Sequence, residues 1–156
     1  MVIERKTQRG GIAGLISRLS NLSKVAVYVG VPADKSSRNA AGINNAELLY
    51  IHTNGSPLRN IPARPVIEPA LEANKGRIMK QYSAAVTAAA EGDSAKFERA
   101  LHRTGLAGQN AARAWFTDPR NGWAPNSPVT IARKGSSRPL IDTGALRKSI
   151  VYVIDG

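Results

Sequence analysis

The spacing of apolar residues predicts a helix near the N-terminus and strands close to both ends of the chain. In the N-terminal helical segment, residues 1–24, apolar side chains recur every three or four positions and so share one helix face. Residues 25–31 are rich in valine and are bounded by Gly30 and Pro32, which is typical of a strand. The β-branched run at 149–154 predicts another strand.

Two further helices are predicted in the middle of the chain. Asn45 is suited to cap a helix that Asn54 and the following glycine end. Pro65 and Pro69 fit the first turn of a longer helix, because proline is tolerated there, and Gly92 ends that helix.

A last helix is expected after Gly92, with Asp93 or Ser94 as its cap. Its apolar stripe contains the small residues Gly105, Gly108 and Ala112. Small side chains let another element approach closely, so this stripe predicts a tight contact within the fold or between subunits.

Polar segments rich in glycine, serine and proline separate these elements. Residues 34–42 and 118–137 are therefore predicted to be exposed, mobile loops. The expected fold is α+β: two or three helices packed on a small, mainly antiparallel sheet, with long loops, in a single domain over residues 1–156.

Composition narrows the function classes. The net charge is +11, from 22 Lys and Arg against 11 Asp and Glu, which favours an acidic partner such as nucleic acid. The basic residues are scattered, however, and eight aromatic residues give poor support to a base-stacking surface.

The sequence predicts no cofactor and no metal site. The absence of cysteine excludes disulfides and thiolate zinc sites, and His52 and His102 lie fifty residues apart without an HExxH motif. The chain also lacks an apolar run long enough to cross a membrane. We expect a protein made in a reducing cytoplasm.

Asp142-Thr143-Gly144 matches the active-site triplet of an aspartic protease. Such an enzyme pairs two carboxylates, so a chain with one triplet must dimerise. In the retroviral-type enzymes the triplet comes early in an all-β domain, whereas here twelve residues follow Gly144 and helical periodicity precedes it.

A structural role explains the same residues. Pro139 makes the approach rigid, and Asp142 is expected to bond the backbone around Thr143 and Gly144. Either Asp142 or Thr143 could instead cap a helical turn over residues 145–147.

Two stretches resemble the phage neck and tail-completion proteins, the HK97 gp10-like group, which is related to the Mu-type virion morphogenesis proteins. The first is His52-Thr53-Asn54-Gly55 followed by Ile61-Pro62-Ala63-Arg64-Pro65. The second runs from Asn126-Ser127-Pro128 through residues 130–134 to Pro139-Leu140-Ile141-Asp142-Thr143-Gly144, with Leu146 and Ser149-Ile150. Val66 stands where that family usually has an aromatic residue.

The resemblance implies a non-enzymatic structural protein of the virion. Proteins of that group form a homo-oligomeric ring, for which a hexamer is expected, around the channel through which DNA leaves. The implied partners are head-closure or connector proteins on one side and tail-terminator or tail proteins on the other, with non-specific contact to DNA. A basic DNA-binding module is the alternative, and a dimeric aspartic protease using Asp142 is the third hypothesis.

Four residues are candidates for contacts with neighbouring molecules. Arg64 is expected either to bind an acidic partner or to pair with groups of its own fold. Trp123 lies in a segment rich in glycine and proline, where an aromatic side chain is a plausible interface anchor. Arg133 and Lys134 are expected to contact a neighbouring ring or DNA phosphate.

Overall fold

The computed structural model describes residues 11–37 and 42–156, and within these ranges the chain forms seven α-helices and one two-stranded sheet. In chain order the elements are α1 (Gly11–Leu22), β1 (Ala26–Gly30), α2 (Asn45–Asn54), α3 (Ile67–Ala73), α4 (Lys75–Glu91), α5 (Ser94–Trp115), α6 (Pro128–Lys134), α7 (Ala145–Ser149) and β2 (Val151–Asp155). The α+β class is confirmed.

The expectation of two or three helices was too low. α3 and α4 were predicted as one helix, but Asn74 interrupts the helical backbone between them. α6 and α7 span seven and five residues, too short for a 3.6-residue period to be visible in the sequence.

The sheet joins the two ends of the described chain. β1 and β2 pair antiparallel, from Ala26 opposite Asp155 to Gly30 opposite Val151. One face of the sheet packs on α5, while Tyr28 and Val153 lie opposite each other on the uncovered face. On the second edge of β2, the Tyr152 amide donates to Gln109 Oε1 of α5 at 3.1 Å.

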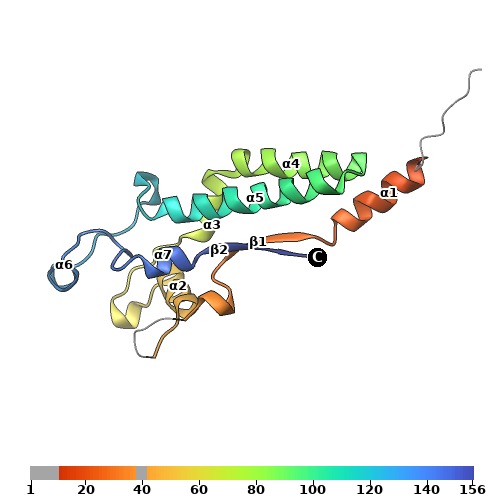
Figure 1. The fold of residues 1–156 in the computed structure, drawn as a ribbon. Helices are drawn as coiled ribbons and strands as arrows, with labels where there is room; N and C mark the ends of the chain where they lie inside the picture. Colours follow the sequence, from red (N-terminus) through yellow and green to blue (C-terminus); the bar gives the residue numbers. More distant parts are fainter. Residues whose placement is uncertain (1–10, 38–41) are drawn as a thin grey trace, which may run out of the picture.

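The centre of the molecule is the antiparallel pair α4 and α5 (Figure 1). Gly92, at φ +77°, ends α4, and the Asp93 carboxylate caps α5 by accepting the Lys96 amide at 2.8 Å. Both helix ends agree with the sequence prediction, with Asp93 rather than Ser94 as the cap.

The small residues of α5 allow the sheet to lie directly on this helix. A Cβ at Gly105 would overlap the Tyr152 ring, and one at Gly108 would lie 2.9 Å from Val29 Cγ2. The predicted close contact is therefore made within the fold, between α5 and both strands.

Two groups of buried side chains form the core. The larger joins α2, α3, the end of α5 and the turn into β2, and the smaller fills the space between α4, α5 and the sheet. The larger group consists of Leu49, Val66, Ala70, Ala112, Trp115, Phe116, Leu146 and Ile150, and the smaller of Ala85, Ala100 and Leu101.

Two further predictions need correction. The cap of α2 is Asn44, whose side chain accepts the Glu47 amide, whereas Asn45 is buried inside the helix. The segment 118–137 is not simply a loop, since it contains α6 and a short 3-10 turn at Pro119–Asn121. Residues 33–35, at the start of the predicted loop 34–42, form another 3-10 turn. Residues 38–41 of that loop and residues 1–10 of the N-terminal segment lie outside the described residues.

Candidate assembly interface

Arg64 ties two distant segments of the chain together. Its side chain is 6% exposed, and it donates from Nε and Nη2 to the Ala124 carbonyl at 3.0 and 2.8 Å and from Nη2 to the Pro125 carbonyl at 3.0 Å. Burial lowers the pKa of the guanidinium. Of the two roles expected for Arg64, the structure shows the one within its own fold.

Trp123 is also held by its own chain. The indole Nε1 donates to the Pro65 carbonyl at 3.0 Å, and the ring meets Phe116 edge to face with centroids 5.8 Å apart. The fold thus gives Trp123 an internal role, and its role as an interface anchor stays a prediction. Together with Arg64, it fastens the segment before α6 to the segment before α3.

The Asn-Ser-Pro sequence at 126–128 builds the start of α6. Asn126 is buried and donates from Nδ2 to the Ser137 carbonyl at 3.3 Å, which joins the segment before α6 to the segment after it. Ser127 Oγ accepts the Thr130 amide at 3.2 Å, and Pro128 occupies the first turn. Gly135 at φ +67° ends the helix.

The two basic residues at the end of α6 differ: Arg133 is exposed to solvent, and Lys134 is bonded to its own chain. Lys134 Nζ donates to the Arg138 carbonyl at 2.9 Å, whereas Arg133 is exposed, as are Val129 and Ile131 on the same helix. Of the two cations proposed for contacts, Arg133 is thus placed for a neighbour, and Lys134 closes the turn after its own helix.

The turn over residues 139–144 leads directly into α7, which β2 follows. Pro139 leads into Leu140, which has a left-handed backbone at φ +57°, and Gly144 at φ +79° is the N-cap of α7. Thr143 Oγ1 accepts the Ala145 amide at 3.3 Å. The hydrogen bond expected from Asp142 to this turn is not formed within the described residues, where the carboxylate is exposed.

These segments enclose one cavity of about 930 Å³, which we call the C-terminal pocket. It brings together most of the residues singled out from sequence, although Trp123 and Pro139 lie outside its wall. Its lining includes His52, Pro62, Arg64, Asn126, Ser127, Arg133, Lys134, Asp142, Thr143 and Gly144.

The C-terminal pocket carries an excess of positive charge. Arg64, Arg133 and Lys134 line it against a single carboxylate, Asp142. Burial lowers the pKa of Lys134; Asp142 opposes this shift, and the charges of Arg64 and Arg133 add to it. A pocket of this charge suits a carboxylate or a phosphate brought by another molecule.

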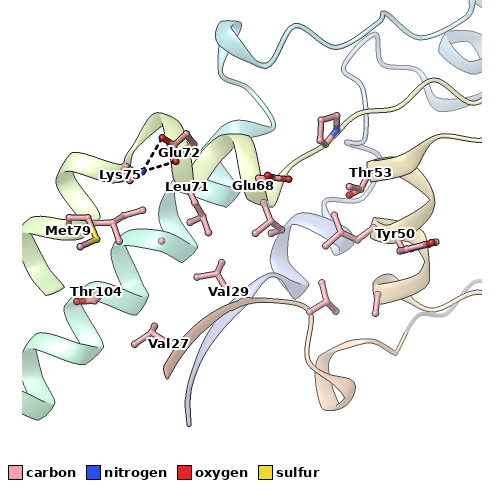
Figure 2. A pocket seen from close by; sticks show the side chains of 17 residues that line it. Val27, Val29, Tyr50, Thr53, Glu68, Leu71, Glu72, Lys75, Met79 and Thr104 are labelled. Carbon is pink, nitrogen blue, oxygen red and sulfur yellow. Dashed lines mark hydrogen bonds and ion pairs between the residues drawn. The ribbon is translucent and has the colours of Figure 1, made fainter. Parts of the chain in front are cut away.

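A second concave surface could not be anticipated from the sequence. This apolar groove, about 780 Å³ in volume, lies between β1, α2, α3, α4 and α5 (Figure 2). Figure 2 shows Tyr50 of α2 at one side, Val27 and Val29 of β1 beneath, and Leu71 and Met79 at the other side. Sequence periodicity indicates that such residues form apolar faces but not that these faces leave a groove between them.

The described part of the chain shows neither a candidate metal site nor a candidate membrane span. Residues 11–37 and 42–156 contain no group of three or more His, Cys, Asp or Glu side chains placed to hold a metal ion. In the same ranges, no helix combines the length and the apolar character needed to cross a bilayer.

Comparison with known proteins gives no independent identification. No protein-family model, curated protein or solved structure matches the chain. The resemblance to phage neck proteins therefore stays a prediction from two sequence stretches, and the geometry of the molecule carries the functional argument.

Proposed function

We propose that this chain is a structural, non-enzymatic protein of a tailed-phage virion, which forms a ring in the neck or tail-completion region around the DNA channel. The observation that carries the proposal is the C-terminal pocket, because both stretches on which the resemblance rests contribute to its wall. Arg64 of the first stretch donates to the Ala124 and Pro125 carbonyls, which directly precede the second stretch.

The pocket and α6 are suited to contact a neighbouring ring protein. α6 extends from one end of the molecule and exposes Val129 and Ile131, while Arg133 lies at the mouth of the basic pocket (Figure 1). Exposed apolar side chains beside an exposed cation fit a protein surface that carries acidic residues. Repetition of this contact around a ring would make a modest single contact strong.

Electron microscopy tests the proposal directly. Negative-stain images of the purified protein should show rings, and antibody labelling of virions should place the protein at the junction of head and tail. A protein that gives neither rings nor label at that junction would contradict the proposal.

A DNA-binding module is the second candidate, favoured by the net charge of +11. It predicts that affinity for duplex DNA falls steeply with salt, in proportion to the phosphates neutralised. Tight, salt-sensitive binding by a protein that forms no ring would favour this candidate over the first.

The protease hypothesis has the least support from the fold. The described residues form one two-stranded sheet among seven helices, and Asp142 lies in a turn beside Lys134. A peptidase assay decides the matter: activity in the parent protein that Asp142→Asn abolishes would restore the hypothesis.

A further inference from the structure

The first helix has an apolar face that the described chain does not cover. Ile12 and Ile16 of α1 are 78% and 61% exposed, and Leu15 and Leu19 are exposed beside them. The C-terminal end of α1 is held by the rest of the molecule, since Leu22 is buried and the Arg18 side chain lies beside Gly92 at the end of α4. α1 is therefore an arm with a fixed base and an open apolar stripe.

The apolar groove has the complementary character. Eight of its 17 lining residues are valine, leucine, isoleucine or methionine, and Met79 is 46% exposed. Glu68 and Glu72 add acidic groups to the same rim, where Lys75 pairs with Glu72 at 3.3 Å. The groove thus offers an apolar floor with acidic groups along one side.

We propose that α1 of one copy docks in the apolar groove of the next copy. The stripe at positions 12, 15, 16 and 19 has the i, i+3, i+4, i+7 spacing with which an amphipathic helix fills a groove. Residues 1–10, which precede α1, hold three basic side chains and one acidic side chain, opposite in sign to the rim, where Glu68 and Glu72 exceed Lys75 by one charge. This proposal rests on the proposed ring and names the surfaces that close it.

The arrangement of the arm requires that the acceptor be another molecule. Figure 1 shows α1 projecting past the end of the α4–α5 pair, away from α2, which forms a wall of the groove. Each copy therefore gives one arm and offers one groove. Such a head-to-tail contact generates a ring when its rotation closes.

Two single variants test this contact. Ile16→Glu disables the arm and Met79→Glu disables the groove; both positions are exposed, so folding should be unchanged by circular dichroism. In sedimentation velocity, the parent protein should form a closed oligomer, whereas each variant alone should be a monomer. Leu58→Glu, at a 99% exposed position outside the groove, is the matched control and should assemble like the parent.

An equimolar mixture of the two variants gives the decisive result. The arm of the Met79→Glu copy is intact and so is the groove of the Ile16→Glu copy, so the mixture should yield a dimer and no larger species. If both variants still assemble like the parent, the ring survives and the arm-in-groove contact is wrong. If Met79→Glu alone abolishes assembly, the groove holds a different segment, which also overturns the proposal.

A cross-link supplies an independent measurement, because the chain contains no cysteine. Oxidation of the Ile16→Cys, Met79→Cys double variant should give a ladder of covalent oligomers, whereas the Ile16→Cys, Leu58→Cys pair should not. A parent protein that remains monomeric at high concentration, with no ladder from the double variant, would overturn both this contact and the homo-oligomeric ring.

Discussion

Two helices of this protein carry similar apolar stripes and use them differently. Along α5, eight residues from Ala100 to Trp115 are buried against α4, the sheet and the larger core. Along α1, the stripe from Ile12 to Leu19 is exposed, and Leu22 is the one buried residue of the helix. Periodicity alone does not distinguish the two helices.

The difference lies in what each helix meets. α5 follows α4 through a two-residue connection and packs back on it, so its stripe is covered by neighbours in sequence and by the strands from both chain ends. α1 precedes the sheet and contacts the rest of the molecule at its base. An apolar stripe therefore predicts that a face will be covered, but the covering element can belong to another molecule.

The largest expected effect compares one truncation in each stripe. Leu101 is 4% exposed in the smaller core, so Leu101→Ala should lower the free energy of unfolding by about 2–5 kcal/mol through lost burial and a residual cavity. Ile16→Ala should change the stability of the monomer by less than about 0.5 kcal/mol, because the side chain is already in water. Urea denaturation of dilute, monomeric protein measures both.

A large loss of monomer stability in Ile16→Ala would show that α1 is part of the monomer core. Equal tolerance of both truncations would instead contradict the burial of the α5 stripe. Either result would mean that the stripes of α1 and α5 do not differ in burial.

The contrast between buried and exposed side chains also separates two arginines of the C-terminal pocket, Arg64 and Arg133. Arg64→Met keeps the apolar stem but removes the donors to Ala124 and Pro125, and should cost about 1.5–3 kcal/mol, as expected for hydrogen bonds from a charged group. Arg133→Met, at an exposed position, should cost less than about 0.5 kcal/mol.

Hydrogen exchange adds a local measurement for this pair. Loss of the Arg64 bonds should raise amide exchange across α6, since they hold the segment that leads into that helix. Similar exchange in both variants would mean that Trp123 and Asn126 suffice to hold α6.

The sequence was most informative where structure is decided locally. Gly55 and Gly92 have left-handed or otherwise positive φ angles at helix ends, and Asp93 caps the helix that follows it. Helix ends and caps depend on interactions within one turn of backbone, so the residue types at those positions predict them. The strand positions were also predicted, because β-branched runs are local signals.

The candidate site was predictable as a set of residues but not as an arrangement. Arg64 bonds a carbonyl 60 residues away, and nothing at either position identifies the partner. The Trp123 indole bonds the Pro65 carbonyl, a partner that is likewise set by tertiary packing. The apolar groove depends on five elements at once and has no sequence signal.

Two glycines should respond with opposite sign. Gly105→Ala should destabilise the protein by roughly 1–2 kcal/mol, because the added Cβ collides with the Tyr152 ring, although alanine favours the helix. Gly14→Ala in α1 meets only ordinary contact, 3.7 Å from Arg18, and should stabilise the protein by about 0.5–1 kcal/mol. Thermal unfolding of the two variants would show midpoints on either side of the parent's, and a stabilising Gly105→Ala would mean that the sheet does not lie on α5.

The smallest expected effect concerns the end of α5, where the covered helix passes into the segment that carries α6. Arg120 donates to both oxygens of Asp118 and holds the pKa of that carboxyl at about 2, below its ordinary 3.8. Because the folded pKa is the lower one, this pair stabilises the fold above pH 3.8, and its contribution is lost as the pH falls through about 2. A carboxyl NMR titration should give a value near 2 in the parent and one closer to 3.8 in Arg120→Gln, with a small loss of stability near neutral pH, as expected for a pair whose cation is exposed. An unchanged Asp118 titration in that variant would show that the backbone amide of residue 120, rather than the guanidinium, fixes the turn that leaves α5.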